Sequence, residues 1–199
     1  MVKDIFTELP ILEDERVLLR PIRKDDFEYL LPFSLNEPDI WKYGLITCAG
    51  EENLRNYING AVKNMEDKKE YVFIVYDKKA GRYAGSTRFY DIQPVYGYTQ
   101  LGFTWYGQEF QRSGLNRHCK LLILTYVFEE WGMERLEFRA HAKNEKSIQA
   151  MKDIGCVVEG ILRSQMPVVD GTRRDSIVLS ILKNEWFNGV KKLLEDKTR

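Results

Sequence analysis

Residues 100–132, which read QLGFTWYGQEFQRSGLNRHCKLLILTYVFEEWG, contain three elements in succession. Gln100–Tyr106 predicts a strand. A turn-prone loop, Gln111–Asn116, follows, and residues 117–132 carry apolar side chains at helical spacing up to Gly132, a natural helix end. A strand that runs through a glycine-containing loop into a long helix is therefore the centre of the predicted fold.

The rest of the chain alternates between strand and helix patterns. Strands are predicted at 16–21, 70–77, 82–92, 135–142, 157–169 and 173–182, and helices at 25–35, 51–65, 144–154 and 185–194. Turns at 78–81 and at Asp170-Gly171 predict two hairpins. This order predicts a mixed sheet with helices packed on it, in the α/β or α+β class.

The composition narrows the function classes. A length of 199 residues predicts one domain, or at most two small ones. Lys plus Arg and Asp plus Glu both number 30, and this balance argues against a nucleic acid as the main partner. No apolar run reaches the length of a membrane span, and the start, MVKDIFTELPILEDE, carries acids where a signal peptide is apolar. We therefore expect a cytoplasmic protein without a membrane partner.

Cysteine and histidine are sparse. The three cysteines, Cys48, Cys119 and Cys156, are too few and odd in number for a disulfide scaffold. Adjacent His118 and Cys119 lack metal-ligand spacing, so we expect no metal site. Because Cys119 lies inside the long predicted helix, a buried packing thiol is favoured over a nucleophile.

The loop before the long helix is the most informative motif. There is no dinucleotide-binding or P-loop fingerprint, and no serine-hydrolase elbow. The first amides of a helix lack internal partners and favour anions. Between Gln111 and Lys120 the chain has three cations, Arg112, Arg117 and Lys120, and no acid. This local surplus suits a phosphate ligand, although a plain strand-to-helix turn with a solvated basic face has the same pattern.

This loop resembles the Q/R-x-x-G-x-G/A acyl-CoA loop of the GNAT acetyltransferase superfamily. Motifs similar to those of its RimJ/RimL-type branch follow in the right order: Leu18-Leu19-Arg20-Pro21 with Asp25-Asp26-Phe27, the strand 100–106, Asn144-Glu145-Lys146-Ser147, Ile154-Gly155-Cys156 with Glu159-Gly160, Leu162-Arg163, and residues 170–175. The resemblance covers about residues 12–187. It implies a single GNAT-like domain over residues 1–199, with a C-terminal helix or tail at 185–199.

The resemblance implies a mostly antiparallel sheet, flanked by helices, whose splayed central strands form an acyl-CoA cleft. It implies transfer of an acetyl group from acetyl-CoA, without a metal, to a primary amine by direct attack. The acceptor would be a protein N-terminus or a small-molecule amine, and a homodimer is plausible. The residues implied to contact acetyl-CoA are Phe103, Thr104, Trp105, Gln111, Arg112, Ser113, Gly114, Leu115, Asn116, Asn144 and Ser147.

Two catalytic candidates follow from the same resemblance. A backbone amide at about Thr104–Tyr106 would stabilise the developing oxyanion, which makes Tyr106 a candidate. Many members protonate the departing thiolate with a tyrosine near the N-x-x-S motif, but the last tyrosine here is Tyr126, so Ser147 is the candidate replacement. For Asn144 and Ser147, helix capping is the simpler role, and both roles can coexist.

Several positions depart from the family pattern. Asn116 stands where glycine or alanine is usual, and asparagine tolerates left-handed backbone. Met166 occupies the position of a glutamate base found in some ribosomal-protein N-acetyltransferases, which argues against such a target. For His141, a packing role is favoured over a role as a general base. These departures keep open the alternative of a catalytically degenerate CoA-binding or interaction module of the same fold. A third hypothesis is an unrelated binding module whose helix start binds some other phosphate ligand.

Overall fold

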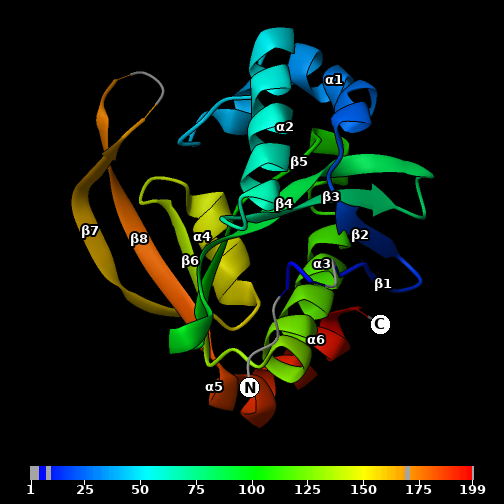
Figure 1. The fold of residues 1–199 in the computed structure, drawn as a ribbon. Helices are drawn as coiled ribbons and strands as arrows, with labels where there is room; N and C mark the ends of the chain where they lie inside the picture. The colour runs from blue at the N-terminus through cyan, green and yellow to red at the C-terminus, as the bar shows by residue number, and fades with distance from the viewer. Residues whose placement is uncertain (1–4, 8–9, 169–170, 199) are drawn as a thin grey trace.

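The computed structural model describes residues 5–7, 10–168 and 171–198, and one eight-stranded sheet forms its centre (Figure 1). The strands are β1 (Leu12–Glu13), β2 (Val17–Pro21), β3 (Tyr71–Asp77), β4 (Arg82–Gln93), β5 (Tyr98–Tyr106), β6 (Arg135–His141), β7 (Val157–Pro167) and β8 (Arg173–Leu182). The helices are α1 (Phe27–Asn36), α2 (Glu51–Glu66), α3 (Leu115–Thr125), α4 (Glu145–Asp153), α5 (Lys183–Glu185) and α6 (Lys191–Thr198). The predicted mixed, mostly antiparallel sheet flanked by helices is confirmed.

The sheet has the strand order β1-β2-β3-β4-β5-β6-β8-β7. Neighbouring strands pair antiparallel, except that β5 and β6 are parallel. A parallel pair needs a crossover connection, and α3 supplies it. The loop before α3 therefore follows the end of β5, at the opposite end of the strand from the residues that pair with β6.

Strands β5 and β6 separate soon after they meet. Their pairing covers only Tyr98–Gln100 against Arg135–Glu137. Farther along β5, Phe103 and Thr104 together face the single residue Thr87 of β4, and Phe103 adopts φ 49°. Such a bulge bends its strand and increases the twist. The bend directs the second half of β5 away from β6, so a V-shaped opening lies between the two strands.

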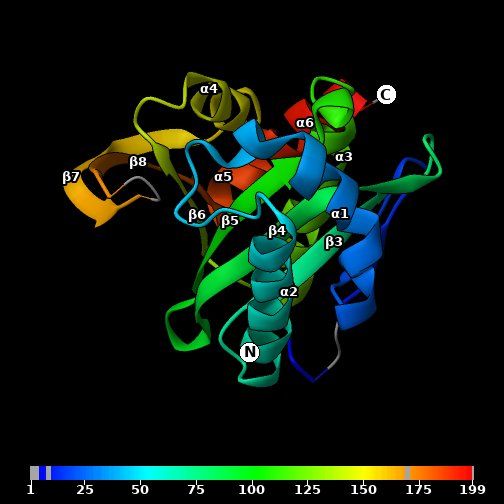
Figure 2. The ribbon, with the colours of Figure 1, turned by 90° about the horizontal axis from the view of Figure 1, so that it is seen from above.

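Helices cover both faces of the sheet. Figure 1 shows α1 and α2 above strands β3 and β4, and α3 and α6 below them; Figure 2 looks down on the face that α1 and α2 cover. Tyr71–Val75 of β3 are completely buried between these layers, which is why that strand is a nearly continuous apolar run. None of the helices among the described residues combines the length and the apolarity that a membrane span requires.

The predicted long helix of residues 117–132 has a different internal geometry. α3 begins earlier, at Leu115, and ends at Thr125, and π-helical turns continue it through Tyr126–Trp131 to Gly132. Gly132 has φ 83° and ends the helix, as expected. The wider turns coincide with buried Tyr126, Val127, Phe128 and Trp131, so this segment contacts apolar neighbours on several sides.

The two ends of the chain differ from the sequence prediction. The single predicted helix at 185–194 consists of α5, a π-helical segment at Trp186–Val190 and α6, because Gly189 departs from helical dihedral angles. The short strand β1 is an addition to the predicted strands. β7 and β8 form the expected hairpin, although Val169 and Asp170 lie outside the described residues.

Lys120 is a charged residue in the core. Only 5% of its surface is exposed, and its Nζ lies 5.8 Å from the centre of the Phe138 ring on β6. It has no acidic partner among the described residues. Burial lowers the pKa of Lys120 to about 8. The folded protein therefore bears an electrostatic cost for this ammonium group at neutral pH.

We expect replacement of Gly85 on β4 by alanine to destabilise the fold by about 3 kcal/mol. A methyl group there would overlap the backbone carbonyl of Trp105 on β5, so the two strands would have to move apart. Gly60→Ala in α2 is the matched control. Its added methyl group meets no atom within 4 Å, and alanine favours helix, so this variant should gain about 1 kcal/mol. Urea unfolding of both variants measures the difference, and equal stabilities would contradict the close approach.

We expect Lys120→Met to be more stable than the wild type at pH 7, by about 3 kcal/mol at most. The pKa of Lys120 is near 8 in the folded state and near 10.5 in the unfolded chain. Between these values the folded state loses the proton first, so wild-type stability rises with pH and the difference disappears above about pH 10.5. Urea unfolding at pH 7 and pH 10 tests this expectation, with exposed Lys152→Met as the control. A difference independent of pH would contradict it.

Candidate functional site

The loop between β5 and α3 presents a series of free backbone amides. Arg112 has φ 60° and Gly114 has φ 89°, so two left-handed residues turn the chain sharply before α3. Ser113 Oγ donates to the carbonyl of Phe110 at 2.7 Å, which fixes the turn. Among the described residues, the amides of Arg112, Ser113, Gly114 and Asn116 have no hydrogen-bond partner. Converging amides at a helix N-terminus form an anion-binding site.

The loop is attached firmly to β5. Gln111 Nε2 donates to the carbonyl of Tyr106 at 3.1 Å, and Leu115 is completely buried. Arg112 and Arg117 are exposed and lie in or next to the loop. The third predicted cation, Lys120, instead points into the core over Phe138. Two cations, rather than three, therefore remain on the solvent side to attract an anion.

Asn116 and Tyr106 are joined by a hydrogen bond that the sequence did not predict. The hydroxyl group of Tyr106 donates to Asn116 Oδ1 at 3.2 Å. Asn116 lies within α3 and has no left-handed backbone, so the expected reason for its tolerance is wrong. Burial raises the pKa of Tyr106 well above 10. The Tyr106 side chain is thus a support between β5 and α3, and only its backbone remains a candidate for chemistry.

The other predicted residues of β5 lie on both faces of the sheet. The Phe103 ring is 5.2 Å from the ring of Tyr90. The Trp105 ring packs on the Trp41 ring at 5.1 Å, and its buried Nε1 has no hydrogen-bond partner in the part of the chain that the structure describes. Thr104 is exposed, and its Oγ1 lies 2.7 Å from that of Thr87. The bulge at Phe103 and Thr104 leaves part of this backbone outside the regular β4–β5 ladder, at the margin of the V-shaped opening.

Asn144 and Ser147 lie beyond the end of β6, on the other margin of the opening. Asn144 is the N-cap of α4, and its Oδ1 accepts the backbone N–H of Ser147 at 3.2 Å. The capping role is thus present, and it uses the amide of Ser147 and not its hydroxyl group. That hydroxyl group has no partner among the described residues. His141 at the end of β6 accepts the N–H of Lys143 through Nδ1, at 3.1 Å, which favours a structural role.

Sequence reasoning missed a group of arginines beside the opening. Arg88 of β4 is 4% exposed, lies between the rings of Tyr57 and Phe103, and pairs with Glu70 at 2.7 Å. Its Nε and Nη2 are buried and have no hydrogen-bond partner among the described residues. Arg139 lies on β6 and Arg174 on β8, two strands that neighbour each other on the far side of β5. A charged residue at an inward position of an apolar strand was the only signal for them in the sequence.

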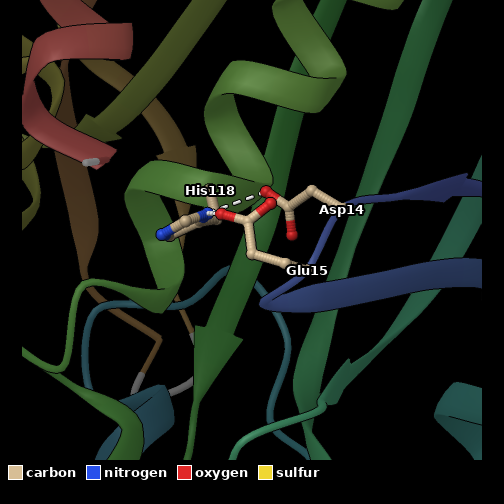
Figure 3. Close-up of side chains that lie close together, drawn as sticks. All are labelled: Asp14, Glu15 and His118. Carbon is tan, nitrogen blue, oxygen red and sulfur yellow. Dashed lines mark hydrogen bonds and ion pairs between the residues drawn. The ribbon is translucent and has the colours of Figure 1, made fainter.

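His118 connects α3 to the turn between β1 and β2. Figure 3 shows its Nδ1 facing Asp14 at 2.7 Å, with Glu15 at 3.9 Å. These three residue types, with ligand atoms within 4.8 Å of one another, also occur in metal sites. Asp14 is already engaged, however, because its Oδ1 accepts the amides of Arg16 and Val17, both at 2.8 Å. We therefore assign this cluster a structural role in holding the first turns of α3.

A shallow pocket of about 430 Å³ lies elsewhere on the molecule. It is lined by Pro94, Val95, Tyr96, Gly97, Gly132, Glu134 and Lys183. These residues surround the start of β5, whereas the loop with the free amides follows its end. The pocket is therefore separate from the candidate site.

Comparisons with known proteins agree with this geometry. Residues 16–157 match the family model described as an acetyltransferase (GNAT) domain. A GCN5-related N-acetyltransferase from Brucella melitensis has a similar structure, with a TM-score of 0.86 and 26% identity, over 95% of this chain and 85% of that one. A candidate acetyltransferase from T. thermophilus gives a TM-score of 0.85 and 28% identity, over 95% and 97%.

A curated relative matches more locally. YdaF of Bacillus subtilis (strain 168), which is named as a candidate ribosomal N-acetyltransferase, is 30% identical over 113 residues. The match spans 57% of this chain and 59% of YdaF. The family model covers far more than half of the chain, and the sheet order, the open V and the amide-rich loop occur together here. The chain therefore belongs to the GNAT acetyltransferase family.

Proposed function

We propose that this acetyltransferase moves the acetyl group of acetyl-CoA to a primary amine, either a protein N-terminus or a small-molecule amine. The observation that carries the proposal is the loop at 111–116, whose free amides lie at the N-terminus of α3 beside the opening between β5 and β6. The loop would bind the pyrophosphate of acetyl-CoA, because both the amides and the helix dipole favour negative charge. The exposed side chains of Arg112 and Arg117 would attract the pyrophosphate as well, although salt in the solvent weakens this attraction.

The opening itself suits the pantetheine arm. After Gln100, β5 has no partner strand on its β6 side among the described residues, so backbone groups along that edge are available to an extended ligand. Asn144 stands at the opposite margin with its Nδ2 unused by the cap, and would bond the amide groups of this arm. The pantetheine arm would pair with the edge of β5 in the way that a strand does. The thioester of acetyl-CoA would then lie near the bulge at Phe103 and Thr104.

Backbone donors at the bulge would support the chemistry. A preorganised amide at Phe103–Thr104, or the neighbouring amides up to Tyr106, would stabilise the negative charge that develops on the acetyl oxygen. The acceptor amine must be neutral to attack. No tyrosine follows Tyr126 in the chain, and the Ser147 hydroxyl group would protonate the departing sulfur.

Two observations about the acceptor amine point in opposite directions. YdaF is named for a ribosomal target, and its similarity would favour a protein N-terminus. In this chain Met166, on exposed β7, occupies the position where the resemblance places a glutamate base, and a methionine cannot accept a proton. We therefore keep both amine classes, and an experimental panel must contain both.

We expect acetyl-CoA to raise the melting temperature of the protein and Gly114→Ala to weaken its binding about tenfold. Gly114 has φ 89°, which strains any other residue, so the substitution would redirect the loop amides. Gly132→Ala is the matched control, since Gly132 has φ 83° and equally free surroundings but lies at the far end of the helix. Calorimetric titration measures the two affinities. Equal weakening would mean that general destabilisation is responsible, and no wild-type binding would disprove the CoA proposal.

We expect Ser147→Ala to lower kcat at least tenfold while the affinity for acetyl-CoA stays nearly constant. The variant keeps the backbone N–H that Asn144 caps, so α4 should remain intact. Asn144→Ala is the comparison, and should cost about 1 kcal/mol of stability through the lost cap. Release of free thiol is measured with a panel of amines and N-terminal peptides. Unchanged turnover in Ser147→Ala would exclude the hydroxyl group, and binding without any thiol release across the panel would favour a degenerate module.

A further inference from the structure

Polar side chains line one face of β6 and β8, although most of them are buried. Arg139 and Glu137 of β6 pair in register with Val178 and Ser180 of β8. Side chains of alternate residues share one face, so Arg139 lies on the same face as Glu137 and, on β8, as Arg174. Glu137 is the last β6 residue paired with β5, so Arg139 stands at the margin of the V-shaped opening.

The acidic residues on this face do not neutralise all of its arginines. Glu137 accepts Arg139 Nε at 2.7 Å through one oxygen and Arg135 Nη2 at 3.2 Å through the other. Glu159 also pairs with Arg135, at 2.6 Å. Arg174 has no acidic partner among the described residues. The surplus positive charge on this face therefore belongs to Arg174, and Arg139 lies on the same face.

Arg174 is buried and oriented, but its donors are not exhausted. It is 6% exposed, its Nε donates to Ser176 Oγ at 2.8 Å, and its Nη1 lies 3.4 Å from the carbonyl oxygen of Tyr43. Its Nη2, and both Nη atoms of Arg139, have no hydrogen-bond partner among the described residues, yet they are not sealed from solvent. Two guanidinium groups thus offer reachable donors to a ligand.

The electrostatics of the two arginines agree with this picture. Burial, together with repulsion by Arg139, lowers the pKa of Arg174, and Tyr90 partly opposes the change. Burial raises the pKa of Tyr90, and the positive charges of Arg139 and Arg174 act against that rise. The Tyr90 ring packs on Phe103 of the bulge. The arginines are therefore near the residues that border the proposed transfer site.

We propose that Arg139 and Arg174 bind a carboxylate group of the acceptor, so that the substrate is an amine that also carries a carboxylate. The inference rests on the proposed acetyl transfer and narrows its acceptor class. A guanidinium group matches a carboxylate in shape and charge, and such charge-assisted bonds are stronger than neutral ones. A bound carboxylate would also give Arg174 the acidic partner that it lacks among the described residues. The carboxylate would belong to a free amino acid or to an acidic side chain near a peptide N-terminus.

Matched acceptors test the proposal. The small-molecule pair is β-alanine and β-alaninamide, and the peptide pair is Ala-Asp-Ala amide and Ala-Asn-Ala amide. With saturating acetyl-CoA, we expect the acid of at least one pair to exceed its neutral partner about tenfold in kcat/KM, measured by thiol release. The pair that shows the preference identifies the source of the carboxylate. Equal rates for acid and amide in both pairs would overturn the proposal while leaving acetyl transfer intact.

Variants connect the preference to the two arginines. Arg139→Met and Arg174→Met should each raise KM for the preferred acid about tenfold, and leave KM for the neutral partner and for acetyl-CoA nearly unchanged. Lysine at either position should restore part of the preference, because it keeps the charge without the planar fork. Arg163→Met, at an exposed position of β7, is the control and should change nothing. Loss of stability without loss of the acid preference would assign Arg174 a purely structural role and overturn the proposal.

A separate measurement covers the case in which no amine is acetylated. N-acetyl-β-alanine and its amide are then compared in thermal melts with CoA present. The acid should raise the melting temperature of the wild type more than the amide does, and this difference should vanish in Arg174→Met. Such a result would support the carboxylate site even though acetyl transfer had failed. Equal shifts with acid and amide would overturn the site itself.

Discussion

β5 and β6 separate after three residue pairs, and the unpaired edge of β5 runs from that point toward the loop before α3. The bulge at Phe103 and Thr104 bends β5 while keeping it paired with β4, so only one side of the strand loses its partner. A sheet that lacks a strand over part of its width leaves backbone hydrogen-bonding groups without partners, and these require water or a ligand. The unpaired edge of β5 and the free amides of the following loop therefore form the surface at which we propose that acetyl-CoA binds.

Helix α3 fixes this surface in space. Leu115 is buried, Tyr106 donates to Asn116, and His118 pairs with Asp14, so the first turns of the helix contact β5 and the β1–β2 turn. These contacts orient the free amides of the loop, which have no partners of their own among the described residues. Rigid support below a loop with unsatisfied donors is the arrangement that binding a phosphate requires, because the donors need no reorganisation when the anion arrives.

Much of the fold could be predicted from local sequence. A run of β-branched and aromatic residues predicts strand Tyr71–Asp77, and apolar residues at helical spacing predict helix Glu51–Glu66. A terminal glycine predicts the end of the long helix at Gly132. Each of these signals acts within a few residues. The π-helical turns after Thr125 and the division of the C-terminal helix at Gly189 could not be predicted in this way. They depend on packing against distant elements, which overrides local helix propensity.

The candidate site likewise has features that follow from local sequence and features that depend on contacts between distant segments. The order of the elements, the loop turn at Gly114 and the cap at Asn144 can be predicted from the sequence, since backbone conformation and capping are local properties. Packing between distant segments, in contrast, places Lys120 in the core, joins Tyr106 to Asn116, and puts Arg139 and Arg174 on one face. Burial and charge balance arise where segments far apart in the chain meet, and no local pattern records which side chains will face one another.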